Sequence, residues 1–284
     1  MPEGDTIFRA ARTLNKALSG QVITGFETVL PKLARVDFDS GVVGRTVESV
    51  SSKGKWILMN FSGDLTLLSH MLMSGSWHIY RPGEAWQRPR HDMRIVLKTE
   101  RIWAVAFNVP IAEFHNADSL RHRQGFKSLG SDVLGADFDE GQAAADLRVN
   151  GDMTVGEALL KQSIIAGLGN VFKSEVCFAC RVNPFRKVSS LSSEELICLM
   201  RTAAKFLRAN VTDGAGDQIV TYTGMRRTTG RTNREERLWV YGRRGEPCRQ
   251  CGTPIESRKQ GEDARTTFWC PACQPDGQSS HVTK

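Results

Sequence analysis

The sequence has no long hydrophobic run and no secretory signal. Its longest uninterrupted apolar stretch covers residues 102–107, far short of the roughly 20 residues that a membrane-spanning helix needs. Near the N-terminus, Glu3 and Asp5 stand where a signal peptide has basic residues followed by an apolar stretch. These absences argue against a membrane or exported protein and predict a cytoplasmic one, associated with the nucleoid if the source is bacterial.

Strong compositional bias is also missing. With 10 Pro, 24% charged and 40% hydrophobic residues, the chain differs from collagenous, disordered and coiled-coil proteins and is able to bury a sizeable core. Its 284 residues correspond to about two domains. Seven cysteines in a cytoplasmic protein favour metal or thiol roles over disulfides.

Positive charge is concentrated in the second half of the chain. Residues 1–150 hold 18 Lys+Arg and 17 Asp+Glu, a net charge of +1, whereas residues 151–284 hold 20 and 14, a net charge of +6. Basic side chains bind polyanions by releasing counterions from phosphates. The asymmetry favours a nucleic-acid partner for the second half, with a solvated basic surface as the alternative.

Hydrophobic periodicity divides the chain into two parts. Apolar residues at helical spacing predict one amphipathic helix over residues 5–18. Short β-rich runs then predict a β-sandwich or barrel, with strands at residues 22–28, 56–61, 65–70, 76–80, 94–98 and 102–107.

The second part begins after a Gly- and Asp-rich linker, with a boundary near residue 135. Helices are predicted at residues 141–148, 155–162, 171–181 and 194–209, the last introduced by a Ser-Ser-Glu-Glu capping box. Residues 213–236, rich in Gly, Thr and Arg, are predicted to form a mobile or ligand-ordered loop. The polar tail after Gln274 is predicted to be disordered.

Four cysteines have the spacing of a zinc ribbon. Cys248 and Cys251 form one close pair, and Cys270 and Cys273 form a second pair after 18 residues. Two such pairs supply four thiolates to a tetrahedral zinc ion and leave no open position for substrate or water. The spacing therefore predicts one structural Zn²⁺, with four unligated thiols as the alternative.

The other three cysteines carry a weaker signal. Cys177 and Cys180 form a further Cys-x2-Cys pair, but they lie in a predicted helix with no second pair nearby. Cys198 lies among apolar residues of another predicted helix. We interpret all three as buried thiols of the helical core.

Residues 162–170 (Gln-Ser-Ile-Ile-Ala-Gly-Leu-Gly-Asn) place two glycines between predicted helices. The chain must turn sharply there, and the next helix begins at or just after Asn170. The N–H groups of a helix N-terminus, together with the Asn170 amide, could bind a phosphate. A purely structural helix corner is the alternative.

Some positions in the first half carry chemistry that local patterns do not assign. Removal of Met1 would leave the secondary amine of Pro2 at the N-terminus, able to attack an electrophilic sugar carbon as amines do in Schiff-base catalysis. Glu3 beside it could shuttle protons. Lys55 lies at a turn before an apolar strand, and Met73 lies between two predicted strands. Taken alone, these positions favour an ordinary N-terminus, a solvent-exposed lysine and a core methionine.

Taken together, six motifs resemble a known family. They are Pro2-Glu3-Gly4, Gly54-Lys55, Met73-x-Gly75-Ser76-Trp77, Ala166-Gly-Leu-Gly-Asn170, Tyr241-Gly-Arg-x-Gly-x-Pro-Cys248 and Arg265-x4-Cys270-Pro-x-Cys273-Gln274. Their order and spacing, from residue 2 to residue 274, resemble the formamidopyrimidine-DNA glycosylase/endonuclease VIII family.

The resemblance implies a bifunctional enzyme of base excision repair, which removes a damaged base from DNA and cleaves the strand at the abasic site by β- or β,δ-elimination. It implies an α+β fold with an N-terminal helix and β-sandwich catalytic domain (residues 1–134), a helix–two-turn–helix DNA-binding domain (135–239) and a zinc ribbon with a short tail (240–284). The protein would act on damaged DNA as a monomer, with one structural Zn²⁺ per chain.

The resemblance also implies residue roles. Pro2 would form a Schiff base with C1′ of the damaged nucleotide, and Glu3 would protonate and deprotonate the opening sugar. Lys55 matches a lysine that binds phosphate and transfers a proton during β-elimination. Arg265 matches an arginine that grips the lesion phosphate and acts in δ-elimination, and Asn170 matches a phosphate-binding asparagine.

Met73 matches the residue that enters the base stack when the damaged base is flipped out, a step with an unstacking cost of a few kcal/mol. Residues 107–113 read Phe-Asn-Val-Pro-Ile-Ala-Glu where the formamidopyrimidine branch carries an Arg-Arg-Phe wedge, and the N-terminal Pro-Glu-Gly resembles the endonuclease VIII branch. The resemblance to the endonuclease VIII branch, which favours oxidised pyrimidines, implies oxidised pyrimidines as substrates. Oxidised purines, including 8-oxoguanine, are one alternative, and a non-catalytic DNA-binding relative is another.

Overall fold

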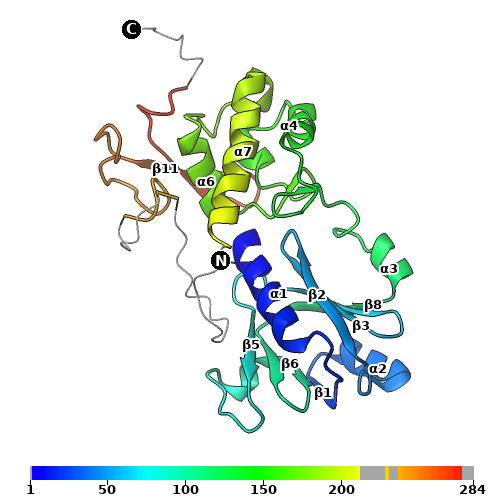
Figure 1. The fold of residues 1–284 in the computed structure, drawn as a ribbon. Helices are drawn as coiled ribbons and strands as arrows, with labels where there is room; N and C mark the ends of the chain where they lie inside the picture. The colour runs from blue at the N-terminus through cyan, green and yellow to red at the C-terminus, as the bar shows by residue number, and fades with distance from the viewer. Residues whose placement is uncertain (1, 212–227, 230–235, 277–284) are drawn as a thin grey trace. The chain divides into compact units, whose positions relative to one another are not determined.

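The computed structural model describes residues 2–211, 228–229 and 236–276, which form two compact units (Figure 1). Unit 1 contains residues 2–128, and unit 2 contains the described residues from 129 onward. The loop predicted at residues 213–236 lies almost entirely outside the described residues, as does most of the polar tail. Among the described residues, no helix is long and apolar enough to cross a membrane.

Unit 1 opens with helix α1 (Gly4–Leu18), which confirms the helix predicted over residues 5–18. Apolar side chains recur every three or four positions along it, so one face is continuous and buried. Ile7, Leu14 and Leu18 are almost fully buried there. This face packs on strands β2 (Val47–Lys53) and β3 (Trp56–Phe61).

Two four-stranded antiparallel sheets form the rest of unit 1. One has the order β1-β6-β7-β5, and the other has the order β2-β3-β4-β8. The remaining strands are β1 (Gly25–Thr28), β4 (Leu65–His70), β5 (Ser76–Tyr80), β6 (Met93–Lys98), β7 (Trp103–Phe107) and β8 (Ile111–His115). One apolar core contains residues of α1 and of both sheets. The predicted helix and β-sandwich are therefore confirmed.

Four elements of unit 1 were not predicted: strands β2 and β8, and helices α2 (Pro31–Ser40) and α3 (Ala117–His122). α2 fully buries only Leu33, and Val36 packs half-buried against the same core, so its apolar face is narrow. Its N-terminal proline was the available signal, since proline is common at the first helical position. α3 has no buried residue at all. Its N-cap Asn116 forms a capping box with Ser119.

Unit 2 is mainly helical, with α4 (Glu140–Val149), α5 (Val155–Ala158), α6 (Asn170–Ala179) and α7 (Ser193–Ala209). The predicted capping box of α7 is confirmed, because Ser192 Oγ accepts from the Glu195 N–H and the Glu195 carboxylate accepts from the Ser192 N–H. α5 is shorter than the predicted helix over residues 155–162. Short strands β9 (Ser131–Asp132) and β10 (Ile165–Ala166) pair in parallel.

The C-terminal part of unit 2 forms a hairpin of β11 (Glu256–Gln260) and β12 (Arg265–Trp269). Helix α6 packs against α7 and β12 and is buried along almost its whole length, including its polar residues. One of these residues, Glu175, accepts hydrogen bonds from the backbone N–H groups of Trp239, Val240 and Tyr241 and from the Thr228 hydroxyl. Desolvation of this buried carboxyl raises its pKa.

The cysteines outside the ribbon differ from the prediction. Cys177 is a free, buried thiol as expected, and burial raises its pKa to about 12. Cys180 and Cys198, in contrast, form a disulfide, so the prediction that they are thiols was wrong. Cys180 caps the C-terminus of α6 and Cys198 lies on α7. The packing of these two helices brings the Cα atoms to 6.0 Å, a proximity that sequence spacing did not indicate.

Candidate functional site

The predicted nucleophile and its neighbour lie at the buried start of α1. Pro2 is buried, and Glu3 is fully buried as the N-cap residue of the helix. The N–H groups of Thr6 and Ile7 both donate to the Glu3 carbonyl at 3.0 Å. Glu3 therefore lies at the N-terminal end of the helix, and its backbone carbonyl accepts the first helical hydrogen bonds. The local fold holds both residues at a rigid helix terminus.

A second buried carboxylate, Asp5, lies in the first turn of the same helix. It accepts from the Thr6 hydroxyl at 3.3 Å and pairs with Arg9 at 3.9 Å. Motif matching drew attention to Pro2 and Glu3 and missed Asp5. Its position in the first turn of a helix with a buried N-terminus was the signal that could have found it.

Lys55 lies in the two-residue turn of the β2–β3 hairpin. Gly54, the first turn residue, has φ +58, which glycine adopts without strain. Lys55 is half-buried, and its positive charge acts on the ring of His70. That ring packs edge-on against Trp56, with the two ring centroids 4.6 Å apart. Burial, and then the charges of Lys55 and Arg123, lower the pKa of His70 to about 4. At neutral pH this imidazole is therefore uncharged.

Met73 lies in the β4–β5 connection, whose conformation is stabilised by contacts among residues 70–75. Met73 and Leu72 are 62% and 44% exposed, whereas Met71 is fully buried. Leu72 has φ +45, and its N–H donates to His70 Nδ1 at 3.1 Å. A Cβ on Gly75 would lie 2.6 Å from the Met71 carbonyl oxygen. The turn thus presents two apolar side chains to solvent, and sequence reasoning identified Met73 but neither Leu72 nor His70.

The segment that replaces the Arg-Arg-Phe wedge is a tight turn. Residues 108–110 join β7 to β8, with Asn108 at φ +48 and Val109 fully buried. The Asn108 side chain accepts from Arg94 at 3.3 Å. Val109 points into the core, Asn108 is half-buried and Pro110 is exposed. This connection, which lies beside the β4–β5 turn, therefore carries no Arg or Phe side chain.

In unit 2, the predicted phosphate-binding residues begin two adjacent elements. Asn170 is the first residue of α6, as predicted, and its Nδ2 donates to the Thr266 carbonyl at 2.8 Å. Its Oδ1 is buried and has no hydrogen-bond partner among the described residues. Arg265, immediately before Thr266, begins β12 and pairs with Asp263 at 3.7 Å. The structure therefore brings Asn170 and the Arg265 backbone together.

The four ribbon cysteines form a cluster suited to zinc. All Sγ atoms of Cys248, Cys251, Cys270 and Cys273 lie within 4.8 Å of one another, with individual separations of 3.5 to 3.9 Å. A tetrahedral site with Zn–S bonds of about 2.3 Å has sulfur atoms about 3.8 Å apart. Backbone N–H groups also donate to two of the sulfurs. The donor set and its spacing fit one structural Zn²⁺ held by four thiolates.

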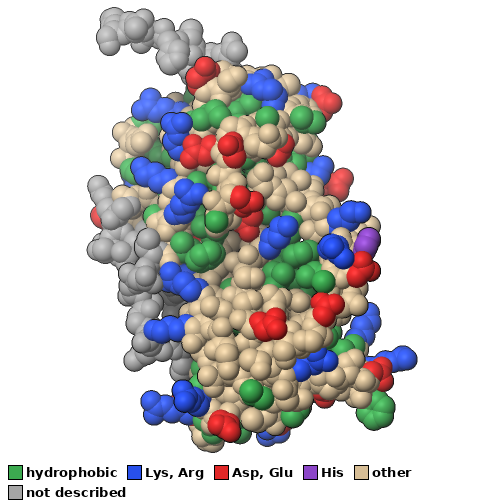
Figure 2. Space-filling view, turned by 45° about the vertical axis from the view of Figure 1, so that its right-hand side comes forward, with side chains coloured by type: hydrophobic (Ala, Val, Ile, Leu, Met, Phe, Trp, Pro, Cys, Tyr) green, Lys and Arg blue, Asp and Glu red, His purple; other side chains and the backbone are tan. Residues whose placement is uncertain are grey.

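The surface charge is mixed. Figure 2 shows Lys and Arg side chains interspersed with Asp and Glu over the visible face. Net charge therefore does not mark a binding surface on this face, and the assignment of the site rests on the individual residues described above.

Comparison with protein families divides the chain into three matched segments. The formamidopyrimidine-DNA glycosylase N-terminal domain matches residues 1–110, and the formamidopyrimidine-DNA glycosylase H2TH domain matches residues 129–221. The zinc finger found in FPG and IleRS matches residues 245–275 and includes all four clustered cysteines.

Curated relatives match over nearly the whole chain. "Probable endonuclease 8 2" of Streptomyces coelicolor is 40% identical, with 96% of this chain and 94% of the relative covered. "DNA-(apurinic or apyrimidinic site) lyase Nei2" of Mycolicibacterium smegmatis is 36% identical, with coverage of 96% and 99%. A formamidopyrimidine-DNA glycosylase of Lactiplantibacillus plantarum is 28% identical, with coverage of 95% and 98%. The higher identities to the endonuclease 8 proteins agree with the predicted branch.

Among solved structures, the formamidopyrimidine-DNA glycosylase of Lactococcus lactis, crystallised non-covalently bound to DNA containing an AP site, superposes with a TM-score of 0.80. The match covers 97% of this chain and all of that one at 24% identity, and it supports the fold. The predicted resemblance is thus confirmed by domain matches, relatives and fold. The chain belongs to the formamidopyrimidine-DNA glycosylase/endonuclease VIII family.

Proposed function

We propose that this protein is a bifunctional DNA glycosylase and abasic-site lyase of base excision repair, which acts as a monomer on oxidised pyrimidines in DNA. The observation that carries the proposal is the placement of Pro2 and Glu3 at the buried start of α1. It occurs in a chain that is 36% to 40% identical to proteins named endonuclease 8 and abasic-site lyase. A degenerate DNA-binding relative would have no need to keep both residues.

The chemistry follows from a secondary amine beside a carboxylate. Once Met1 is removed, the Pro2 nitrogen attacks C1′ of the damaged nucleotide, and the bond between C1′ and the base breaks. Glu3 protonates the sugar ring oxygen as the ring opens, which leaves an iminium between Pro2 and C1′. Loss of a proton from C2′ then expels the 3′ phosphate by β-elimination.

Basic and polar residues hold the DNA in this scheme. Lys55 binds a phosphate and transfers a proton during β-elimination. After burial, its positive charge is the next cause of the lowered pKa of His70. Asn170 and Arg265 bind phosphates at the lesion, and Arg265 also assists δ-elimination. Four-thiolate zinc stabilises the ribbon that carries Arg265 and takes no part in the chemistry.

The preference for pyrimidines is supported by two observations. The relatives named endonuclease 8 have higher identities than the formamidopyrimidine-DNA glycosylases quoted above. In addition, the β7–β8 connection is a tight turn with Val109 buried, unlike the Arg-Arg-Phe wedge. Met73, with Leu72, occupies the space left by the flipped base.

Borohydride trapping tests the proposal. The protein with a free N-terminus and a C-terminal tag is incubated with oligonucleotides containing an abasic site, thymine glycol or 8-oxoguanine. We expect a covalent complex that peptide mass spectrometry locates at Pro2, with faster trapping on thymine glycol than on 8-oxoguanine. Pro2→Gly and a Gly-Ser extension before Pro2 should both abolish trapping, because each removes the secondary amine from the N-terminus.

The outcomes separate the alternatives. Faster trapping on 8-oxoguanine would assign the protein to oxidised purines. DNA binding without any covalent complex would favour the non-catalytic alternative. Trapping that persists after the N-terminal extension would refute Pro2 as the nucleophile.

A further inference from the structure

Strand β12 is bound to one face of α6 at two successive residues. Asn170 Nδ2 donates to the Thr266 carbonyl at 2.8 Å, and Lys173 Nζ donates to Thr267 Oγ1 at 2.6 Å. Asn170 and Lys173 are three residues apart and so lie on the same face of the helix. The face of α6 that carries Asn170 therefore also binds β12, the strand whose first residue is Arg265.

The contact at Lys173 belongs to a longer buried network. Thr267 Oγ1 donates to Gln260 Oε1 at 2.7 Å, and Gln260 Nε2 donates at 2.8 Å to both Thr154 Oγ1 and the Pro184 carbonyl. A hydroxyl has one proton to donate, so Thr267 accepts from the lysine and donates to the glutamine. Lys173 and Thr267 are fully buried and Gln260 is nearly so. This network crosses the hairpin from α6 to the N-cap of α5.

Gly156 packs so closely against Gln260 that only a residue without a side chain fits there. A Cβ on that residue would lie 2.3 Å from Gln260 Oε1 and 2.8 Å from Gln260 Nε2. The backbone N–H of Gly156 donates to the same Pro184 carbonyl that accepts from Gln260. A side chain at position 156 would displace the glutamine amide, and with it the partner of Thr267.

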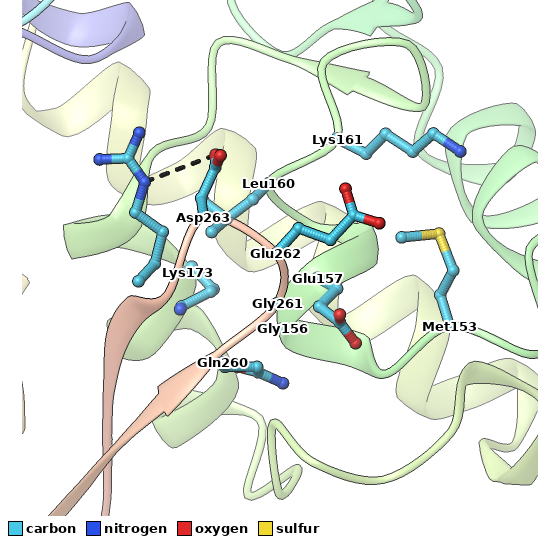
Figure 3. A pocket seen from close by; sticks show the side chains of 11 residues that line it. Met153, Gly156, Glu157, Leu160, Lys161, Lys173, Gln260, Gly261, Glu262 and Asp263 are labelled. Atoms are coloured by element: carbon cyan, nitrogen blue, oxygen red, sulfur yellow. Dashed lines mark ion pairs between the residues drawn. The ribbon is translucent and has the colours of Figure 1, made fainter.

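Arg265 lies at the edge of a pocket of about 400 Å³ beside the hairpin turn. In Figure 3, Glu262 and Asp263 point to different sides of the turn, and the dashed line marks the ion pair between Asp263 and Arg265. The turn contains two residues with positive φ, Gly261 at +72 and Ala264 at +47. Arg265 follows this turn directly and is the first residue of β12, so its backbone moves with that strand.

We propose that Lys173 is a positioning residue, which fixes β12 on α6 through Thr267 and so sets the position of Arg265 relative to Asn170. This inference rests on the proposed function, in which Arg265 and Asn170 bind phosphates at the lesion. Two phosphate ligands on separate elements act together only if their spacing matches the DNA backbone. The Lys173–Thr267 hydrogen bond supplies that match from inside the unit.

Burying a lysine amino group costs desolvation free energy, and its presence in this core therefore supports a role in positioning. An apolar side chain of similar length would fill the same volume without desolvating an amino group. It would not, however, hold the Thr267 hydroxyl at a defined point. Lys173→Met therefore keeps the packing and removes the hydrogen bond, which separates positioning from folding.

The experiment compares Lys173→Met, Thr267→Val and the double variant with the parent protein. Binding to a duplex with a tetrahydrofuran abasic-site analogue is measured over a range of salt concentrations, and β- and δ-elimination products are measured on abasic-site DNA. Lys161→Met is the matched control, because Lys161 lines the same pocket but lies outside the network. Zinc content and circular dichroism check that every variant is folded.

We expect Lys173→Met to bind the duplex about tenfold more weakly, the loss expected for one charged hydrogen bond, and to yield a smaller share of δ-product. The double variant should lose less than the sum of the two single variants, because both changes break the Lys173–Thr267 hydrogen bond, while Thr267→Val also removes the one to Gln260. If Lys173→Met matches Lys161→Met in affinity and product ratio, the positioning role is refuted. If the parent protein forms no Schiff base, the proposed function fails, and the binding measurement still tests Lys173.

Discussion

The two units hold their proposed site residues in different ways. In unit 1, Pro2, Glu3 and Lys55 lie at the ends of elements whose packing is apolar: a helix N-terminus and a hairpin turn on a hydrophobic sandwich. In unit 2, Asn170 and Arg265 are held by buried polar side chains between segments far apart in the chain. Apolar packing and the geometry of a helix end and a turn contribute to placing the first set, whereas long-range hydrogen bonds and the metal site contribute to placing the second.

Removing zinc should unfold the ribbon of unit 2 and leave unit 1 folded. Structural zinc sites contribute about 10 kcal/mol or more of folding free energy, so Cys248→Ser should unfold the ribbon and abolish DNA binding. Hydrogen exchange should rise over residues 236–276 and stay unchanged in α1. Cys177→Ala, which removes a cysteine outside the cluster, should retain the metal. A metal-free Cys248→Ser protein with native exchange in the ribbon would contradict the structural role of zinc.

Glu175→Ala tests the polar core of unit 2. The substitution leaves three backbone N–H groups, the buried one of Val240 and the half-buried ones of Trp239 and Tyr241, without their acceptor. At about 1–3 kcal/mol for each unsatisfied group, the free energy of unfolding should fall by about 4 kcal/mol, measured in urea with zinc present. Glu175→Gln, which keeps one acceptor oxygen, should lose less. The exposed Glu194→Ala should have almost no effect, and an equal loss there would contradict the explanation.

Acid should weaken unit 1 before unit 2. Burial is the main cause that lowers the pKa of both His70 and His78 to about 4 from an ordinary value of 6.5. The unfolded chain therefore binds more protons than the folded one between pH 6.5 and about 4, so stability falls as pH decreases through that window. All histidines that the structure describes lie in unit 1.

Unfolding followed by hydrogen exchange at pH 7 and pH 5 should show this loss in the sandwich, with a dependence of up to one proton for each histidine. His78→Gln should flatten the dependence, whereas the exposed His122→Gln should leave it unchanged. A pH dependence of equal size in the helices of unit 2 would show that these histidines are not its source.

The smallest expected effect concerns the disulfide between Cys180 and Cys198. Their sequence separation is 18, and cross-links that close loops of this length stabilise by about 3 kcal/mol or less. Cys198→Ser, or reduction with a thiol, should lower the stability of unit 2 by that amount without releasing zinc or changing unit 1. Identical denaturation curves for the reduced and oxidised protein would show that the bond contributes nothing.

Features encoded by nearby residues were predictable from the sequence. The apolar period of α1, the β-rich runs of β3, β4 and β5, and the Ser192–Glu195 capping box each involve residues close together in the chain. The zinc cysteines were predictable because two short pairs with ribbon spacing have few other uses. The remaining site residues were identified by family motifs, and their roles stay predictions.

Features that depend on distant segments were not predictable. Lys173 and Glu175 look like ordinary polar residues of an amphipathic helix, because nothing in their neighbourhood shows that strands and loops cover α6 on every side. The disulfide was missed for the same reason, since Cys180 and Cys198 become neighbours only when α6 packs on α7. Asp5 was missed because the N-terminal motif that carries the resemblance ends at Gly4.

The burial of α6 also has a consequence for synthesis on the ribosome. Unit 1 uses residues 2–128 among those described, so these residues are synthesised before those of unit 2. Helix α6, in contrast, is covered by residues 239–241 and by β12, and the Asn183 amide donates to the carbonyl of Gln274. N-terminal domains generally fold first during translation. Unit 2 cannot complete these contacts until Gln274 has been synthesised, and until then its buried lysine and glutamate remain in water.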